Sequence, residues 1–368
     1  MVALGPVDGR NKLASGVRDL SLLPVPQSTR AHLVWVRVLD CIPGLQRNLC
    51  EVFRLLLFAK RTLWLVLPLP KRPLSILAVL VALFSATMRA QSPGPRDFLN
   101  TPVNQAVVWV DYVGTSAETV VADLPLPNNQ SVSRVFSPTI LVSFPFDHRY
   151  AGVSLTVPYS KVEVKGATGK VDTSGFNDPA IAFHANIFGL PALTRDHISE
   201  WIPKTFLSFH LTINPPLGEY DRNSSVNTGG NRWAFTPLFN LNIPLNKGVA
   251  WVEVYAWGRF FTDNDELQGN NLLSQHPLGV VGAYYSHNLG KKMYAAIGGY
   301  YDYGGETFVN HVAQHDVSNA FRPSVGISRK FGKFRVGLRY ENTASKPNAV
   351  SSSGLLVLKV SLPPVFRF

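Results

Sequence analysis

Between residues 103 and 368 the chain repeats one pattern about twelve times: a segment of roughly ten residues in which apolar and polar side chains tend to alternate, followed by a connection. Tight turns and long polar loops alternate as connections, and Phe331-Gly332-Lys333 is the last tight turn. Successive side chains of a strand point to opposite faces, so each segment predicts a strand with one apolar face. A bilayer requires every backbone group to be hydrogen-bonded within the protein, which only helices and closed barrels achieve. After the start of the chain no run is long and apolar enough for a spanning helix, so the pattern favours a closed barrel.

Residues 206–214 show the alternation in its simplest form, and residues 180–188, 251–261 and 334–341 repeat it. A soluble β-sandwich alternates as well. The export signal, the alternation of loop lengths and the last residue of the chain favour the membrane barrel. Within residues 206–214 the apolar set is Leu207, Phe209, Leu211 and Ile213, and the polar set is Ser208, His210, Thr212 and Asn214.

These segments predict an all-β fold, a closed antiparallel transmembrane barrel of about twelve strands. With that number both ends of the barrel chain lie beside the short turns, which are periplasmic in bacterial outer-membrane barrels, and the long loops are extracellular. The expected strands are 103–113, 134–144, 150–158, 177–188, 205–214, 232–243, 248–261, 277–287, 293–303, 320–330, 333–341 and 355–368. The expected long loops are 114–133, 159–176, 215–231, 262–276, 304–319 and 342–354.

The start of the chain contains an expected export signal. Lys71-Arg72 precede an apolar run over residues 74–84, and Ala90-Gln91 is the expected cleavage position. A basic start, a short apolar run and small residues are typical of a secretory signal peptide. Because such a signal stands at the beginning of a chain, residues 1–70 are interpreted as an upstream extension from a start codon assigned too early, or as a disordered segment. A cytoplasmic or membrane-anchoring extension is the alternative. The expected domains are therefore 1–70, the signal peptide 71–90 and the barrel 91–368.

The positive charge of the chain lies mostly in its first quarter. Residues 1–90 hold 12 of the 35 Lys and Arg and 4 of the 24 Asp and Glu, which leaves 23 basic and 20 acidic residues in 91–368. A nucleic-acid-binding protein needs a basic face on its folded part, so no nucleic-acid partner is expected. Cys41 and Cys50 also precede residue 91, which excludes a disulfide or a thiolate metal site in the barrel.

The last residues resemble the signal by which outer-membrane barrels reach their assembly machinery. Apolar residues occupy alternate positions and the chain ends in Phe368, so the barrel assembly machinery is an expected partner through that residue. Pro363-Pro364 departs from the pattern, because proline donates no ladder hydrogen bond, and predicts a kinked or short last strand. Aromatic residues expected to form girdles at the two membrane interfaces are Trp233, Tyr255, Trp257, Tyr284, Tyr285, Tyr300, Tyr301 and Tyr340.

Five strings of residues follow one another in order: Asp97-Phe-Leu-Asn-Thr-Pro-Val-Asn104, Ser174-Gly-Phe-Asn-Asp-Pro179, Pro216-Leu-Gly-Glu-Tyr-Asp221, Asn231-Arg-Trp-Ala-Phe235 and Phe260-Phe-Thr-Asp-Asn-Asp265. Their order and spacing resemble the bacterial family named for a MetA pathway of phenol degradation, over most of residues 96–368 and none of 1–90. The resemblance implies an outer-membrane, channel-like barrel that the family's name links to uptake of aromatic or other hydrophobic compounds. It supplies no catalytic residues. A more distant resemblance is to barrels that import long-chain fatty acids.

The polar faces of the strands are expected to form the inside of the barrel. One interpretation is a polar, mildly cationic path for solutes. The other is a network of ion pairs that fills a narrow barrel, since charges removed from water need partners. The expected lumen-lining residues are His184, His210, Glu253, Arg259, Arg322, Arg335, Arg339 and Glu341, with Lys330 on the same face.

Carboxylates follow several strand ends on the expected outer side. Oxygen ligands at alternate positions suit Ca²⁺ or Mg²⁺, but the spacing lacks the glycine and the distal glutamate of a dedicated calcium loop. Turn-forming, solvated rim residues are therefore favoured, and no metal site is predicted. Asp263 and Asp265 are alternatively expected to pair with Arg232 across the rim. The rim and loop candidates are Glu219, Asp221, Arg232, Asp263 and Asp265.

No enzyme is predicted. Some twelve-stranded barrels are lipases, but Ser208 and His210 stand about 7 Å apart on one strand face, too far for the hydrogen bond that activates a nucleophile. No phosphate-binding glycine loop or dinucleotide fingerprint occurs, so no cofactor is expected. The predicted function is passive or facilitated passage of small hydrophobic or aromatic solutes through the bacterial outer membrane, whose lipid is a second partner. The alternatives are a non-conducting structural or adhesive barrel and, less favoured, a barrel lipase.

Overall fold

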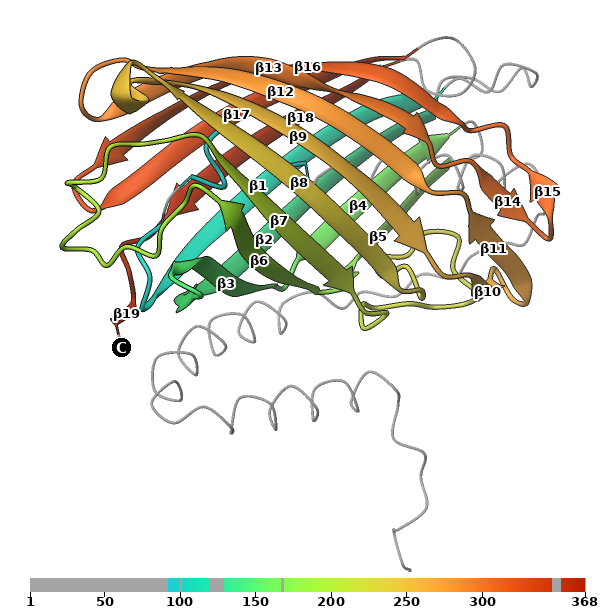
Figure 1. Ribbon diagram of the computed structural model, residues 1–368. Helices are drawn as coiled ribbons and strands as arrows, with labels where there is room; N and C mark the ends of the chain where they lie inside the picture. The colour runs from blue at the N-terminus through green and yellow to red at the C-terminus, as the bar shows by residue number, and fades with distance from the viewer. Residues whose placement is uncertain (1–91, 100, 120–128, 167–168, 346–351, 368) are drawn as a thin grey trace, which may run out of the picture. The chain divides into compact units, whose positions relative to one another are not determined.

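The computed structural model describes residues 92–99, 101–119, 129–166, 169–345 and 352–367, which form a closed antiparallel β-barrel (Figure 1). The barrel strands are β1 (Gln105–Thr119), β2 (Asn129–Phe146), β3 (Arg149–Thr156), β4 (Tyr159–Gly166), β5 (Gly169–Phe176), β6 (Ala180–Phe188), β7 (Phe206–Asn214), β8 (Ala234–Leu245), β9 (Ala250–Phe261), β12 (Leu278–Asn288), β13 (Met293–Gly304), β16 (Ser318–Phe331), β17 (Phe334–Ser345) and β18 (Ser352–Ser361).

Two of the barrel strands are interrupted. β2 pairs along one side with β3 and then β4, which are separated by Val157-Pro158, and β4 and β3 pair in turn with β5 and β6. Counting β3 with β4 and β5 with β6, the described residues contain twelve barrel strands, each paired with its neighbours in the chain. β1 pairs with both β2 and β18, which closes the ring. The predicted fold class is confirmed.

The turns at one end are short because their residues adopt the backbone conformations that tight hairpins need. β2 and β3 are joined by Asp147 and His148, both with positive φ (47° and 60°), as in a type I′ turn. β16 and β17 are joined by Gly332-Lys333, with φ of 56° at the glycine. The other long connections lie at the opposite end, whereas residues 189–205 between β6 and β7 form a long connection at the same end as the short turns. These two ends are called the short-turn end and the long-loop end.

The outer face of the barrel is apolar. Large hydrophobic side chains on successive strands are 44–61% exposed: Phe239, Val281, Ile297, Phe321 and Leu338. Residues one position away on the same strands point inward and are buried, as Asn240 and Arg339 do. Such a continuous apolar belt around a closed barrel is what contact with lipid requires. Among the described residues, none of the helical segments has both the length and the hydropathy of a membrane-crossing helix.

The predicted loop 159–176 is wrong, because those residues form the β4–β5 hairpin. The error arises because β4 has its apolar side chains on the inner face and its charged side chains on the outer face, the reverse of the strands in the apolar belt. In β4, Ser160, Val162 and Val164 point inward and are buried, whereas Lys161 and Lys165 point outward. The outward charges exclude contact with lipid, so this hairpin extends the wall beyond the apolar belt.

The predicted long loops 262–276 and 304–319 also contain strands. They form a second, four-stranded sheet at the long-loop end, with the order β10 (Asn264–Leu267), β11 (Asn271–Gln275), β14 (Thr307–Val309) and β15 (Val312–Ala313) (Figure 1). Its buried core is Leu267, Leu273 and Val309. The last predicted strand is interrupted as expected: β18 ends at Ser361, and β19 (Phe366–Arg367) pairs with the beginning of β1. The predicted extension 1–70, the signal peptide 71–90 and Phe368 lie outside the described residues.

Three of the expected girdle aromatics lie inside the barrel instead. Tyr255, Tyr284 and Tyr300 have exposures of 0–1% and form an inner cluster with Val280 and Ala296. Their rings meet edge to face, with centroids 5.5–6.3 Å apart, an arrangement that aromatic pairs favour. Of the remaining expected girdle residues, Trp257 packs against this inner cluster, and Trp233, Tyr285, Tyr301 and Tyr340 are 42–47% exposed.

The inner cluster needs a glycine beside it. A Cβ atom at Gly282 would lie 2.0 Å from Cδ1 of Tyr300, so Gly282→Ala forces that ring to move. We expect a loss of about 1–3 kcal/mol, typical of overpacking, seen as a lower temperature at which the folded band disappears in a gel-shift assay. Gly279→Ala on the same strand is the control, because its nearest atom is 3.7 Å away. Equal transition temperatures for the two variants would contradict the packing argument.

Candidate functional site: the barrel lumen

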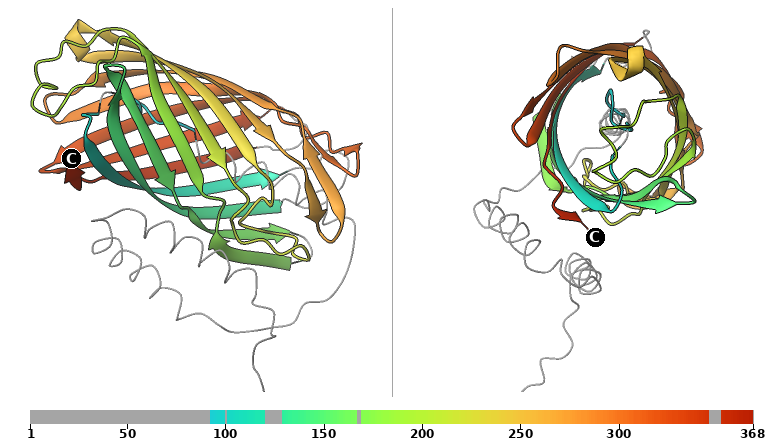
Figure 2. Two further views of the ribbon diagram at one scale, coloured as in Figure 1. Left: turned by 60° about the horizontal axis from the view of Figure 1, so that its bottom comes forward. Right: turned by 60° about the vertical axis from the view of Figure 1, so that its left-hand side comes forward.

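Residues 92–99, called the lumen segment, run inside the barrel before the chain enters β1 (Figure 2, right). Inward-facing side chains of β9, β12, β13, β16, β17 and β18 bond to this segment. It is therefore attached to half of the wall.

The lumen segment is bent by a tight turn over Gly94-Pro95-Arg96-Asp97. The Asp97 N–H donates to the Gly94 carbonyl over 3.2 Å, and Arg96 has a φ of 65°. Proline second and a positive φ third describe a type II turn, in which the third residue is usually glycine. Arg96 therefore occupies an unfavourable backbone conformation, and contacts of its own compensate for it.

Those contacts fix Arg96 to β9 and β12. Its N–H donates to Oε2 of Glu253 (2.8 Å), Nε donates to Ser286 Oγ (2.8 Å) and Nη1 donates to Asn288 Oδ1 (2.6 Å). The guanidinium also lies over the Tyr294 ring, 4.3 Å from its centroid. Hydrogen bonds and a cation–π contact together hold this part of the segment against the wall.

Backbone carbonyls of the lumen segment accept hydrogen bonds from three wall tyrosines. Tyr300 donates to the Pro93 carbonyl, Tyr294 donates to the Pro95 carbonyl over 3.0 Å, and Tyr255 donates to the Gly94 carbonyl over 3.4 Å. Because Pro93 and Pro95 lack an N–H and Gly94 N–H bonds to Asp97 Oδ2 at 2.6 Å, the buried turn has few donors left to satisfy. The tyrosines supply donors where the segment offers acceptors.

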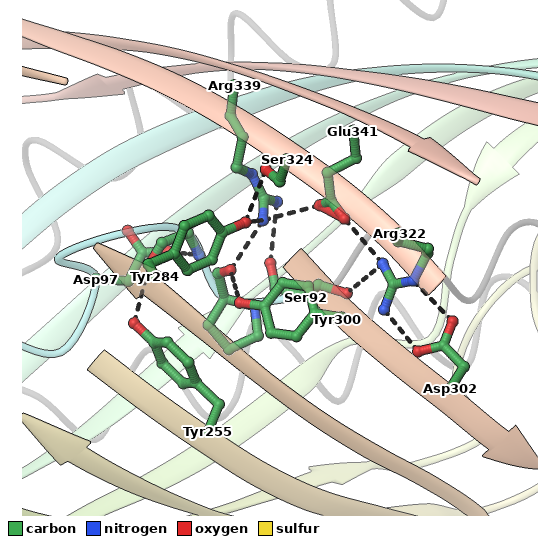
Figure 3. Close-up of polar contacts among 12 residues, drawn as sticks. Ser92, Asp97, Tyr255, Tyr284, Tyr300, Asp302, Arg322, Ser324, Arg339 and Glu341 are labelled. Atoms are coloured by element: carbon green, nitrogen blue, oxygen red, sulfur yellow. Dashed lines mark hydrogen bonds and ion pairs between the residues drawn. The ribbon is translucent and has the colours of Figure 1, made fainter. Parts of the chain in front are cut away.

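Two arginines and two carboxylates form a buried network beside the segment (Figure 3). Arg322 donates two hydrogen bonds to Asp302 (2.7 and 2.8 Å) and one to Glu341 (2.9 Å). Arg339 pairs with Glu341 at 2.9 Å and donates to the carbonyls of Pro93 (2.8 Å) and Ser92 (3.0 Å). The charges balance within the network, and Arg339 connects it to the lumen segment.

The far end of the segment contacts a histidine pair. Phe98 stacks on His210, with ring centroids 3.9 Å apart. His210 and His184 face each other on β7 and β6, and their Nδ1 atoms are 2.8 Å apart, so one ring donates and the other accepts. His184 Nε2 bonds to Ser154 Oγ at 2.9 Å. Lys359 on β18 completes the set by pairing with Asp97 at 2.7 Å.

The segment does not fill the whole lumen. A cavity of about 830 Å³ remains, whose wall includes polar and apolar side chains from most strands. Cavities of about 300–1,000 Å³ are large enough for small organic ligands. Of the residues expected to line the lumen, the wall of this cavity includes His184, His210, Arg259, Arg322 and Arg339. Glu253 and Glu341 are buried beside the segment, Arg335 lies over the Tyr294 ring, and Lys330 is exposed near the short-turn end.

Four of the strings named above meet at the long-loop end. The Asp178 carboxylate accepts hydrogen bonds from the N–H groups of Gly218 and Gly230, both over 2.8 Å. A Cβ on Gly218 would lie 2.7 Å from the Asp178 nitrogen, so the close approach requires glycine. The Arg232 guanidinium lies over the Phe261 ring, 4.4 Å from its centroid. Residues far apart in the sequence thus build one structured mouth.

The rim carboxylates are not gathered into one site. Glu219 accepts a hydrogen bond from the backbone of β5, and Asp221 accepts one within its own loop. Asp263 and Asp265 are exposed. The ion pairs between described residues include none from Arg232 to either of them, so the expected pairing across the rim is wrong. No group of metal-ligating side chains occurs in the described part of the chain.

Ser208 is buried and accepts a hydrogen bond from Asn186 over 3.3 Å, whereas His210 bonds to His184. The described contacts thus place neither residue as the activated partner of the other. The lumen segment and the inner tyrosines were not predicted as site residues. The sequence could have indicated the position of the tyrosines, because Tyr255 lies on the same strand face as Glu253 and Arg259, two residues expected in the lumen. The segment has no such signal, because Ser92-Pro-Gly-Pro-Arg96 reads as an ordinary polar turn.

Comparisons with solved structures show the fold. An outer-membrane channel of Pseudomonas putida F1 superposes with a TM-score of 0.64 at 18% identity, over 74% of this chain and 99% of that chain. The transport unit of the autotransporter AIDA-I of Escherichia coli gives 0.45 at 9%, over 80% and 99%. The P. putida toluene transporter TodX gives 0.39 at 8%, over 73% and 91%.

The comparison with curated protein sequences gave no match. The model of one protein family, described as "Putative MetA-pathway of phenol degradation", matches residues 135–355. These residues include four of the barrel-wide strings that suggested the resemblance, and they make up more than half of the 368 residues. This chain therefore belongs to the family described as "Putative MetA-pathway of phenol degradation".

Proposed function

We propose that this protein is a channel of the bacterial outer membrane that passes small hydrophobic or aromatic solutes by passive or facilitated diffusion. Residues 71–90 act as its export signal, its short turns are periplasmic and its long loops are extracellular. The lumen segment is a movable obstruction of the path. The observation that carries the proposal is the closed barrel whose lumen keeps a cavity of about 830 Å³ next to a segment held only by non-covalent contacts.

The composition of the cavity wall supports passage of small solutes of mixed character. Its residues include Trp257, Leu238 and Val280 as well as several charged side chains. Apolar surface makes the transfer of a hydrophobic solute out of water favourable, and a few polar groups orient the solute in the cavity. Conduction requires a solute to bind weakly enough to leave as well as enter.

The experiment that tests the proposal is single-channel recording of the full-length chain, exported by an expression host and inserted into a planar bilayer. We expect discrete current steps that phenol or toluene reduces in a concentration-dependent way. A folded, heat-modifiable barrel that stays silent at all voltages would refute conduction and favour the structural barrel.

The side chain of Arg96 offers a graded test of the obstruction. Arg96→Gly keeps the turn, because glycine favours positive φ, but removes two side-chain hydrogen bonds and the contact with Tyr294. A net loss of about 1–3 kcal/mol shifts the equilibrium toward a displaced segment by roughly 5- to 150-fold. Single-channel recording should therefore show longer open times. Arg96→Lys keeps the charge, so its open times should lie between those of the parent chain and Arg96→Gly. Unchanged open times in Arg96→Gly would contradict the role of the segment as an obstruction.

A second candidate function is a non-conducting structural barrel. It is favoured by the number of contacts on the lumen segment, which bonds to six strands of the wall. The two functions differ in one measurable respect: the structural barrel shows no current in the intact protein even at high voltage.

A further inference from the structure

We infer that the long-loop end of the lumen carries a binding site for a carboxylate with an apolar body, built from Arg232 and Arg259 over the Phe261 ring. The inference names the substrate class of the proposed channel and rests on that function for its place in transport. Binding itself can be measured whether or not the barrel conducts.

The two guanidinium groups share one aromatic ring. Arg232 stands just before β8 and Arg259 lies near the end of β9, and their Cζ atoms are 4.4 and 5.6 Å from the Phe261 centroid. All three residues line the cavity. The arginines are nevertheless only 3% and 8% exposed. Stacking on a ring holds each planar guanidinium in a fixed orientation, so the site is formed before a ligand arrives.

The Arg232 side chain has donors to spare. Its Nη2 donates to Gln275 Oε1 over 2.5 Å, but Nε and Nη1 have no hydrogen-bond partner among the described residues. A guanidinium carries five N–H donors and no acceptor. Leaving buried donors of a charged group unpaired is unfavourable, and each of these two N–H groups can donate a charge-assisted hydrogen bond to a carboxylate oxygen.

No ion pair between described residues neutralises Arg232. The half-buried Asp178 acts on Arg232 electrostatically, but its carboxylate accepts hydrogen bonds from the backbone N–H groups of Gly218 and Gly230. Asp263 is close enough to act on Arg232 electrostatically but is exposed and forms no ion pair with it in the described structure. Burial, and secondly the Arg259 charge, lower the pKa of Arg232 to about 10. Arg232 is cationic at neutral pH, and a ligand carboxylate would give it the ion pair that the described residues do not supply.

Apolar side chains also line the wall beside the two arginines, and they indicate the rest of the ligand. Leu278 is the direct cross-strand partner of Arg259, and Trp257 is the partner of both Leu238 and Val280. All four apolar residues line the same cavity. A carboxylate that accepts from the free Arg232 donors therefore places its hydrocarbon part against tryptophan and aliphatic side chains. Aromatic and short aliphatic monocarboxylates fit this arrangement better than neutral hydrocarbons or polar anions.

The test compares benzoate with benzyl alcohol, which keeps the ring and removes the charge, by calorimetric titration of the detergent-solubilised full-length protein. We expect benzoate to bind at least about tenfold more tightly. Arg232→Gln should weaken benzoate binding at least about tenfold and leave benzyl alcohol unchanged, and Arg232→Lys should fall between because it keeps the charge without the planar fork. Arg259→Gln serves as the second variant if Arg232→Gln does not fold.

Arg134→Gln is the matched control, since Arg134 lies on the outer surface of β2 toward the same end of the barrel, with 51% of its side chain exposed. Equal affinity for the two ligands, no benzoate binding, or equal losses in Arg232→Gln and Arg134→Gln would overturn the site. Benzoate binding in a barrel that carries no current would instead refute the proposed channel function and leave the site standing.

Discussion

Replacing residues 92–99 with a glycine-serine segment of the same length is expected to raise the single-channel conductance on the order of tenfold. The replacement removes the Arg96 contacts, the Lys359–Asp97 pair and the stacking of Phe98 on His210. Each hydrogen bond contributes about 0.5–1.5 kcal/mol, and bonds to charged groups about twice that. Together they outweigh the roughly 5.5 kcal/mol that separates a mostly obstructed lumen from a mostly open one.

The control for this replacement is the same change at residues 194–200, a connection between β6 and β7 whose residues are mostly exposed and do not line the cavity. Its conductance should equal that of the parent chain. Equal conductance in all three proteins would mean that the segment does not obstruct the ion path.

Arg322→Met should destabilise the barrel more than any other single substitution considered above. The change leaves Asp302 and part of Glu341 without their cation at side-chain exposures of 2–3%. Removing one member of a buried ion pair costs about 3–5 kcal/mol, because the remaining charge is uncompensated. Urea unfolding in detergent, followed by tryptophan fluorescence, should show a transition at markedly lower denaturant concentration.

Lys330→Met is the matched control, because Lys330 lies on the same strand and the same inward face but is exposed. Its unfolding transition should move little. If the two variants unfold at the same urea concentration, the Arg322 network contributes no more to stability than a surface charge does.

The fold could be predicted from the sequence because the bilayer imposes one rule on every strand. Residues such as Phe209, Val254 and Leu338 must face lipid, and their neighbours must face inward, so alternation and loop length identify the strands. Strand segments that extend beyond the bilayer do not have to follow this alternation. The β4–β5 hairpin has Lys161 and Lys165 on its outer face, and its inverted pattern was therefore taken for a loop.

The site was less predictable, because it depends on contacts across the lumen. Strand alternation placed Arg322, Arg339 and Glu341 inside the barrel. It did not select Asp302, which pairs with Arg322, or Lys359, which pairs with Asp97 of the lumen segment. Tyr255, Tyr284 and Tyr300 were assigned to the interfaces by residue type, although their position along the strand pointed inward. Residue type misleads here because a buried tyrosine needs only an acceptor for its hydroxyl, which the lumen segment supplies to Tyr255 and Tyr300 and Ser324 supplies to Tyr284.

The lumen segment shows the limit of local sequence analysis. Nothing in Ser92-Pro-Gly-Pro-Arg96 has a strand or helix period, and its conformation is set by wall residues about 160–250 positions away. The pairing of Arg232 is a second example. Their expected places at strand ends on the outer rim suggested Asp263 and Asp265 as partners, whereas the fold places Phe261, Gln275 and Arg259 beside Arg232.

The measurement that tests the central claim most directly is modification of an introduced cysteine while single-channel current is recorded. Thr212 lines the cavity, and Leu211, its neighbour on β7, belongs to the outward-facing set. A charged methanethiosulfonate reagent should lower the current stepwise in Thr212→Cys and leave Leu211→Cys and the parent chain unchanged. Current that is equally insensitive, or equally sensitive, at both positions would contradict a solute path through the lumen.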